Sequence, residues 1–291
     1  MDLWYSELHT DNVKMSIKIK EHLHSEESRF QKIDIFDSIE FGKFLTLDGF
    51  LQFTERDEFI YHEMITHVPM ATHPNPQNIL VVGAGNGGVL GELLKYPCVQ
   101  NIDLVEIDQQ IVEVCKKYMP RNTAYFDHER VNVTFQNGLK YVRNCEDKYD
   151  VIIVDTTDPF GPGEALFTKE FYGSCYKALK EDGIMVNQHE SPFYTADANV
   201  MKRAHNRIVK SFPISRVYQA HIPTYPSGHW LFGFASKKYH PVKDMKVMPW
   251  KHLNIETKYY NTNLHKGAFY LPTYVEHMLM ECEEGEDEYV R

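Results

Sequence analysis

The chain has 291 residues, 43% of them hydrophobic and 25% charged, and its formal net charge is -10 at pH 7. This length and apolar fraction fit a folded protein, either one large domain or a core domain with a smaller addition, and exclude a disordered chain. The negative charge argues against nonspecific nucleic-acid binding and favours a cationic partner. The lack of a signal-peptide pattern and of an apolar run near about 18 residues predicts a cytoplasmic protein without a membrane partner.

The first 54 residues predict a small antiparallel β domain. Alternating apolar and polar residues, typical of strands with one buried face, occur in SIKIKEHL, FQKIDIFDSI and KFLTLDGFLQF, and turn residues such as Gly42 and Asp48-Gly49 separate these runs. An amphipathic helix is predicted from Glu55 to about Thr72, ended by the turn-forming segment HPNP.

After this turn, short apolar strands alternate with helical segments in the order NILVV, VLGELLKY, NIDLVEI, QQIVEVCKKYM, VNVTF, LKYVRN and VIIVD. The alternation predicts a parallel, doubly wound sheet, and it continues with a helix at 168–179, a strand at 183–188 and a helix at about 196–211. The last runs, SRVYQAHI and WLFGFAS, predict an antiparallel hairpin that closes the sheet. The expected fold is therefore α/β: a Rossmann-like, methyltransferase-type domain in residues 55–291 after the β domain in residues 1–54.

A glycine-rich turn marks a nucleotide site. Gly83, Gly85 and Gly88 satisfy G-x-G-x-x-G directly after the strand NILVV, and Glu106 ends the next strand, where an acidic side chain can bind both ribose hydroxyls. A dinucleotide and an adenosyl sulfonium both present such a ribose. The predicted antiparallel hairpin and the acidic loop after VIIVD favour the sulfonium.

That acidic loop places Asp155 and Asp158 at the carboxyl edge of the sheet, where ligands bind in open α/β folds. Two carboxylates facing a nucleotide site indicate a second, cationic ligand. The five cysteines are far apart and have no histidines at metal-ligand spacing, which indicates reduced thiols and predicts no metal site.

Long blocks of the chain resemble the polyamine aminopropyltransferases, the spermidine synthase family, over nearly its whole length. The blocks are LWYSE, SRFQ, LDGFLQFTERDEFIYHEM, HPNPQNILVVGAGNGG, LVEID, VIIVDTTDPFGPGEALFTKEFY, ALKEDGI and IPTYPSG. The resemblance implies an enzyme that is a homodimer or homotetramer and needs no metal or other cofactor. It also implies aminopropyl transfer from decarboxylated S-adenosylmethionine to a diamine, usually putrescine, with spermidine and methylthioadenosine as products.

The resemblance also assigns roles at matching positions. Asp155 would be the catalytic base, and Tyr61, grouped with it, would line the amine channel. The donor would be held by Gln31, His62, Gly83, Gly85, Asn86, Glu106, Asn137 and Gly138, with Pro162 over it. The amine would be bound by Asp158, Gln188 and Tyr225, with Gln52 and Trp4 near the channel mouth.

Three positions depart from the family pattern. The family turn reads GGGDGG, and its aspartate pairs with the terminal ammonium of the aminopropyl group. Here Ala84 replaces a glycine, Asn86 replaces that aspartate, and Asn137 stands where the family has an aspartate at the adenine. Intact S-adenosylmethionine carries a carboxylate on the same carbon, which an aspartate repels and an asparagine can hydrogen-bond. Asn86 therefore relaxes selection for the decarboxylated donor.

Several functions follow from these residues. Aminopropyl transfer making spermidine or a near relative is preferred, because Asp155, Asp158 and Glu106 remain. One alternative is methyl or aminocarboxypropyl transfer from intact S-adenosylmethionine, since plant putrescine methyltransferases resemble spermidine synthases in this way. Others are a different acceptor such as agmatine or cadaverine, and a non-catalytic amine-binding homologue. The acceptor, the donor and the choice between dimer and tetramer stay open.

Overall fold

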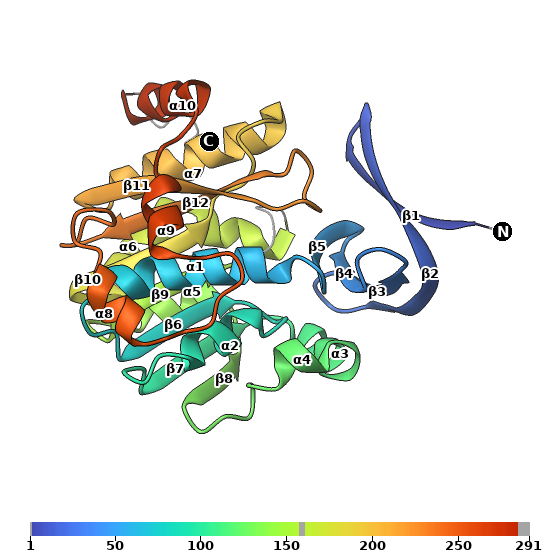
Figure 1. Ribbon diagram of the computed structural model, residues 1–291, viewed down its shortest axis with the longest axis horizontal. Helices are drawn as coiled ribbons and strands as arrows, with labels where there is room; N and C mark the ends of the chain where they lie inside the picture. Colours follow the sequence, from blue (N-terminus) through green and yellow to red (C-terminus); the bar gives the residue numbers. More distant parts are fainter. Residues whose placement is uncertain (1, 157–160, 285–291) are drawn as a thin grey trace.

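The computed structural model describes residues 2–156 and 161–284. Its N-terminal part is a five-stranded antiparallel sheet in the order β1-β2-β3-β4-β5, and β1 and β2 project away from the rest of the molecule (Figure 1). The strands are β1 (Leu3–Thr10), β2 (Val13–Glu27), β3 (Lys32–Ser38), β4 (Lys43–Leu47) and β5 (Phe50–Thr54). The predicted antiparallel β domain is thus confirmed as an element of the fold.

Strand β1 was not among the predicted runs. Its inward side chains include Tyr5 and Glu7, whereas the outward ones include Trp4 and Leu8, which are 54% and 61% exposed. Because both faces of β1 carry apolar side chains, the alternation that identifies a half-buried strand is weak in its sequence.

Helix α1 (Glu58–Thr72) leads from β5 across the larger sheet (Figure 1). The prediction that it is amphipathic is wrong, because every residue from Ile60 to Thr72 is buried. Glu63 finds its partners inside the fold, since it accepts hydrogen bonds from the backbone N–H groups of residues 258–260 at 2.7–2.8 Å. A helix covered on all sides can therefore keep polar residues on the face that periodicity assigns to solvent.

The larger sheet has seven strands in the order β11-β12-β10-β9-β6-β7-β8. Its strands are β6 (Asn78–Gly83), β7 (Asn101–Glu106), β8 (Val131–Phe135), β9 (Tyr149–Asp155), β10 (Leu179–Gln188), β11 (Ile214–His221) and β12 (His229–Ser236). The first five run parallel, and β12 is antiparallel to both β10 and β11. The predicted doubly wound sheet with a closing antiparallel hairpin is confirmed.

Helices cover both faces of this sheet. They are α2 (Gly88–Leu94), α3 (Gln109–Tyr118), α4 (Pro120–Thr123), α5 (Gly138–Arg143), α6 (Lys169–Ala178) and α7 (Thr195–Val209), with a 3-10 helix η1 (Gly161–Phe167) before α6. The C-terminal helices α8 (Val247–His252), α9 (Thr262–Gly267) and α10 (Thr273–Glu284) were not predicted.

Alternate residues of the central strand β6 belong to different cores. Ile79 and Val81 pack with α1 and α2, whereas Leu80 and Val82 pack with α5 and α6. This two-sided burial is why the strand reads as a continuous apolar run. It also fixes the carboxyl ends of β6, β7 and β9, where Gly83, Glu106 and Asp155 lie side by side.

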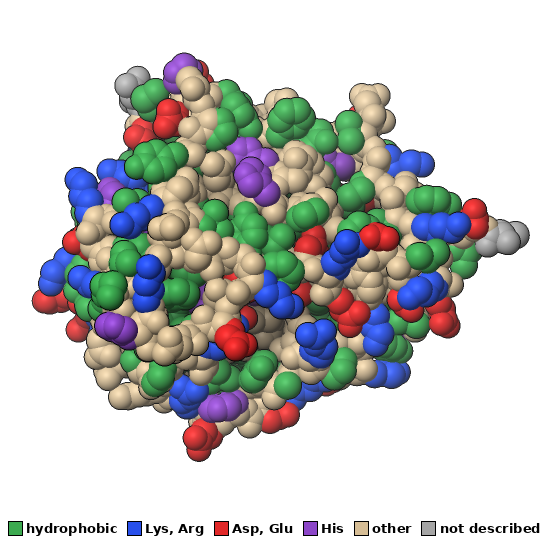
Figure 2. Space-filling view, in the orientation of Figure 1, with side chains coloured by type: hydrophobic (Ala, Val, Ile, Leu, Met, Phe, Trp, Pro, Cys, Tyr) green, Lys and Arg blue, Asp and Glu red, His purple; other side chains and the backbone are tan. Residues whose placement is uncertain are grey.

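On the face drawn in Figure 2, acidic and basic side chains are interspersed. All five cysteines are free thiols. Among residues 2–156 and 161–284, no helix is long and apolar enough to cross a membrane, and no group of three or more His, Cys, Asp or Glu side chains could hold a metal ion.

Candidate active site

Two cavities open at the carboxyl edge of the larger sheet, under the N-terminal sheet. They share the residues Gln52, Asn86, Asp155 and Thr156. The first cavity is also lined by Phe30, Gln31, Gly83, Gly85, Glu106, Asn137 and Gly138, among others. The second is also lined by Glu7, His9, Tyr61, His62, Gln188, Glu190, Asp197, Tyr225 and Trp230. Most of the residues assigned from the sequence are thus brought together, and Asp155 stands where the two cavities meet.

The glycine turn after β6 passes very close to β9. Gly83 has a φ of +87°, and a Cβ there would lie 2.0 Å from the backbone oxygen of Asp155. The next residue, Ala84, also has a positive φ of 60°, and its N–H donates to the same oxygen at 2.9 Å. The turn therefore requires glycine at position 83, and it exposes backbone to the first cavity.

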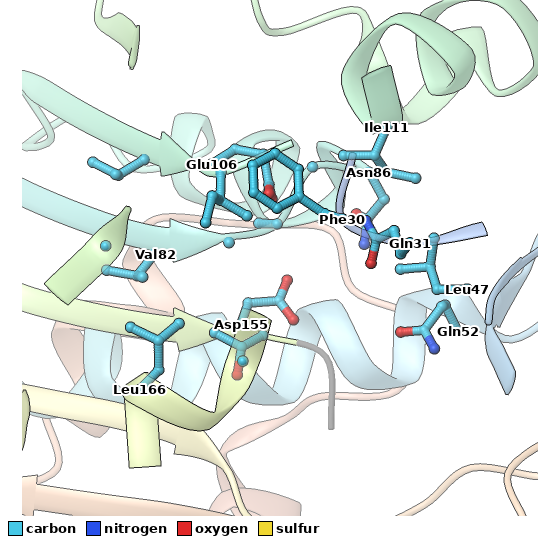
Figure 3. Close-up of a pocket in the computed structure, with 18 of the residues that line it drawn as sticks. Phe30, Gln31, Leu47, Gln52, Val82, Asn86, Glu106, Ile111, Asp155 and Leu166 are labelled. Atoms are coloured by element: carbon cyan, nitrogen blue, oxygen red, sulfur yellow. The ribbon is translucent and has the colours of Figure 1, made fainter. Parts of the chain in front are cut away.

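Glu106 lies at the floor of the first cavity. It is 8% exposed, and burial raises its pKa to about 7, although backbone N–H groups of Asp108 and Ile107 act in the opposite direction. Figure 3 shows its side chain beside Phe30 and across the cavity from Asp155. A carboxylate so placed is suited to accept hydrogen bonds from ligand hydroxyls.

A polar contact between the two sheets positions Gln31. Asp108, at the N-terminus of α3, accepts hydrogen bonds from Ser28 Oγ at 2.7 Å and from Gln31 Nε2 at 3.0 Å. Ser28 and Asp108 occur in the blocks SRFQ and LVEID, but the sequence comparison with the family gave no role to either. Their contribution depends on a contact between segments 80 residues apart, which periodicity cannot detect.

Asp155 ends strand β9, and its carboxylate points into the cavity (Figure 3). Tyr61 Oη donates to Asp155 Oδ1 at 2.7 Å, whereas Oδ2 is buried without a hydrogen-bond partner among the described residues. Burial raises the pKa of Asp155, while the charge of His62 and the hydrogen bond from Tyr61 lower it. A buried carboxylate oxygen without a partner is costly, so Oδ2 is available to a ligand group that donates a hydrogen bond.

His62 and Asn86 both lie close to Gly88. The His62 ring leaves no room for a side chain there, because a Cβ on Gly88 would be 2.0 Å from it. His62 Nδ1 bonds the Glu58 carboxylate. Burial alone would lower the pKa of His62, but that bond and the charge of Glu58 raise it. His62 was expected in the adenosyl site, yet it lines the second cavity and not the first. Asn86 Oδ1 accepts the Gly88 N–H at 2.8 Å.

The second cavity combines carboxylates with aromatic rings. Gln188 donates to Glu190 at 2.7 Å, and both side chains are buried. Tyr225 packs edge-on to Trp230 with ring centroids 4.7 Å apart, and its hydroxyl donates to the backbone oxygen of Gln52 at 2.6 Å. Such walls suit a cation with an apolar chain.

Glu7, His9 and Asp197 are among the residues of this cavity that were missed from the sequence. His9 bridges Asp197 Oδ2 at 3.1 Å and Glu7 Oε1 at 3.6 Å. His9 in β1 and Asp197 in α7 are 188 residues apart in the sequence. No local sequence pattern therefore predicts their contact, which the fold reveals.

One sequence-predicted residue lines neither cavity, and two others fall wholly or partly outside the described residues. Trp4 lines neither of them, because it lies on the outward face of β1. Asp158 lies outside the described residues. Pro162 is the second residue of η1, and its side chain is not among those described. Gly163 and Leu166 of the same helix line the first cavity.

Comparison with known proteins gives a consistent family. Residues 58–246 match a family model described as the spermine/spermidine synthase domain, and residues 3–55 match the spermidine synthase tetramerisation domain. The polyamine aminopropyltransferase of Clostridium beijerinckii is 63% identical over 279 residues, covering 96% of this chain and 98% of the relative. That of Alkaliphilus oremlandii is 60% identical over 284 residues, covering 98% and 100%.

Solved structures show the same likeness. A spermidine synthase in complex with the transition-state analogue AdoDATO is 44% identical, with a TM-score of 0.93 and coverage of 96% of this chain and 95% of that one. The spermidine synthase from Thermotoga maritima is also 44% identical, with a TM-score of 0.92 and coverage of 96% and 94%.

Proposed function

The chain belongs to the spermine/spermidine synthase family of polyamine aminopropyltransferases, and we propose that its reaction is aminopropyl transfer from decarboxylated S-adenosylmethionine to putrescine. The products are spermidine and methylthioadenosine. The observation that carries this proposal is the position of Asp155, whose unpartnered Oδ2 lies where the two cavities meet.

The donor occupies the first cavity. Glu106 accepts hydrogen bonds from the ribose hydroxyls, and Asn137 and Gly138 contact the base. Asn137 Oδ1 already accepts the Lys140 N–H at 3.1 Å, which leaves its NH₂ group to bind an acceptor on the base edge. The sulfonium then lies toward Asn86 and Asp155, at the shared end of the cavity.

The acceptor occupies the second cavity and attacks from there. With a pKa near that of lysine, about one amine in 2,500 is neutral at pH 7, a deficit of roughly 4.6 kcal/mol for the nucleophile. Asp155 Oδ2 accepts a hydrogen bond from the attacking nitrogen and then takes its proton, while Tyr61 holds Oδ1. The nitrogen displaces the thioether in line, and the C–S electron pair leaves with sulfur.

Holding the two reacting atoms in place lowers the barrier by more than the free energy needed to deprotonate the amine. Holding nitrogen and sulfonium carbon in line can supply on the order of 7 to 11 kcal/mol, which exceeds the deficit of the neutral amine. Gln188, Tyr225 and Asp158 are proposed to fix the amine, with Asp158 on its far ammonium. No step needs a metal ion or other cofactor.

The assembly is a homo-oligomer built through the N-terminal sheet, which matches a tetramerisation domain. Leu3, Trp4 and Leu8 are exposed apolar side chains of β1, and they are proposed to lie in that interface. In this proposal, Trp4 contacts a neighbouring subunit and contributes to assembly.

The test is product identification. The protein is incubated with decarboxylated or intact S-adenosylmethionine and with putrescine, cadaverine, agmatine or spermidine, and products are identified by mass spectrometry. Methylthioadenosine and spermidine in equal amounts, from the decarboxylated donor and putrescine, support the proposal. S-adenosylhomocysteine as the nucleoside product would replace it with methyl transfer.

A second candidate, use of the intact donor, is favoured by the orientation of Asn86. Since Asn86 Oδ1 accepts the Gly88 N–H at 2.8 Å, the NH₂ group of the side chain is left for the cavities. An NH₂ group donates to a carboxylate and cannot accept from an ammonium. An aminocarboxypropyl product from intact donor would support this candidate, and its absence with tight binding of decarboxylated donor would refute it.

A further inference from the structure

Asp57 stands directly before α1, yet its carboxylate does not cap that helix. An aspartate at this position normally accepts backbone N–H groups of the first helical turn. Asp57 makes no such bond, and its backbone φ of -126° and ψ of 1° are unusual for a capping residue. The side chain is only 5% exposed, so its bonds must come from elsewhere in the fold.

Asp57 instead joins two distant segments. Its Oδ1 accepts from Thr54 Oγ1 at 2.6 Å, at the end of β5. Its Oδ2 accepts from the hydroxyl and the backbone N–H of Thr224, at 2.7 and 3.1 Å. Thr224 belongs to the loop of residues 222–228, which connects β11 to β12 and is called here the hairpin loop.

The next residue of the hairpin loop forms a wall of the second cavity. Tyr225 donates its hydroxyl to the backbone oxygen of Gln52, two residues before Thr54, at 2.6 Å. Adjacent residues of the loop are therefore fastened to adjacent parts of β5 and α1. Tyr225 and Pro226 line the second cavity, whereas none of the described residues lining the first cavity belongs to the loop.

We propose that Asp57 is a positioning residue for the amine acceptor: it holds the hairpin loop so that Tyr225 closes the second cavity, and the donor site does not depend on it. This inference rests on the proposed function, because it takes the second cavity as the acceptor site. Gln52, which the two cavities share, is bonded to the hairpin loop through Tyr225, but the bonds of the Asp57 carboxylate go to Thr54 and Thr224 and not to Gln52, the glycine turn or Glu106.

Asp57→Asn tests the proposal with almost no change in volume. The amide can keep its oxygen on the Thr224 groups while its NH₂ donates to a reoriented Thr54 hydroxyl, so the bonds to both residues can form, but they lose the charge assistance of the carboxylate. Thr224→Val is the milder variant, because it removes the hydroxyl bond and keeps the backbone one. Loss of one charge-assisted hydrogen bond corresponds to roughly tenfold in an equilibrium constant.

The matched control is Asp150→Asn. Asp150 is also 5% exposed, and its carboxylate accepts hydrogen bonds from the N–H groups of Gln77 and Asn78. It lies near the start of β9, whereas Asp155 and the cavities lie at the end of that strand. A loss of general stability therefore appears in both variants, whereas a positioning effect appears only at Asp57.

Steady-state kinetics with varied putrescine, and calorimetry with methylthioadenosine, give the readouts. For Asp57→Asn we expect the KM for putrescine to rise about tenfold or more, with kcat at saturating amine and affinity for methylthioadenosine within about twofold. Thr224→Val should show a smaller rise, and Asp150→Asn none. An unchanged putrescine KM, or an equal loss of methylthioadenosine affinity, would overturn the proposal, as would the same KM rise in Asp150→Asn.

Failure of the proposed function gives a different result. Putrescine binding is also measured by calorimetry with methylthioadenosine present, so the effect of Asp57→Asn on amine affinity can be read without turnover. Wild-type protein that binds putrescine but forms no spermidine contradicts the reaction alone. Wild-type affinity for putrescine in both Asp57→Asn and Thr224→Val contradicts the positioning role alone.

Discussion

Replacement of Asp155 by Asn removes the proposed base while keeping the shape of the side chain. The amide oxygen can still accept from Tyr61 Oη, which now bonds Oδ1 at 2.7 Å, so the NH₂ group takes the place of the unpartnered Oδ2. That group cannot receive a proton from the attacking amine. General-base catalysis contributes roughly 10²- to 10⁴-fold, so we expect kcat to fall by about that factor, or ~3 to 5 kcal/mol in barrier height.

The same variant should be at least as stable as the wild type at neutral pH. Burial raises the pKa of Asp155 in the folded protein, so keeping it ionised costs folding free energy at any pH above its unfolded value of about 3.9. Asn carries no such cost. The gain in stability should therefore be present at pH 7 and vanish on acidification below about pH 4, where the wild-type carboxyl is protonated in both states.

The assay measures methylthioadenosine release with decarboxylated donor and saturating putrescine, alongside calorimetric affinity for methylthioadenosine and thermal unfolding. We expect lost turnover, unchanged nucleoside affinity and a melting temperature no lower than that of the wild type. Activity above about a tenth of wild type, a barrier change below ~1.4 kcal/mol, would refute Asp155 as the base.

Three more outcomes are expected. Because burial raises the pKa of Glu106 to about 7, methylthioadenosine should bind up to about tenfold more tightly as pH rises from about 6 to about 8, and Glu106→Gln should bind more weakly with no such pH dependence by calorimetry. Ser28→Ala, which removes one of the bonds to Asp108, should weaken nucleoside binding a few-fold and leave the putrescine KM unchanged in the kinetic assay. The Trp4→Glu, Leu8→Glu double variant should shift the oligomer toward smaller species in light scattering, and an unchanged mass would show that the outward face of β1 is not in the interface.

The parallel strands of the large sheet were predictable because they are buried on both faces. Runs such as those of β6 and β9 stay apolar throughout, and glycine or acidic residues end them. The presence of helix α1 could also be predicted, but its burial on all sides could not. Its polar residues Glu63 and His67 bond to partners far along the chain, and the periodicity of the helix does not reveal such partners. The boundary between residues 54 and 55 stays a prediction.

The first cavity, proposed for the donor, was more predictable from the sequence than the second, proposed for the acceptor. Gly83, Glu106 and Asp155 end neighbouring strands, so strand order alone brings them together. The second cavity instead depends on contacts between remote segments, such as those of His9 with Asp197 and of Asp57 with Thr224. No local pattern encodes such contacts. The family resemblance placed His62 with the adenosyl group, whereas the side chain lines the second cavity and not the first.

The most direct test of the account is a crystal structure with methylthioadenosine and putrescine bound together. We predict the nucleoside in the first cavity with its ribose on Glu106, and one putrescine nitrogen within hydrogen-bond reach of Asp155 Oδ2, about 2.6 to 3.2 Å. A nucleoside outside the first cavity, or a putrescine with neither nitrogen near Asp155, would contradict the claim that the two substrates meet at this carboxylate.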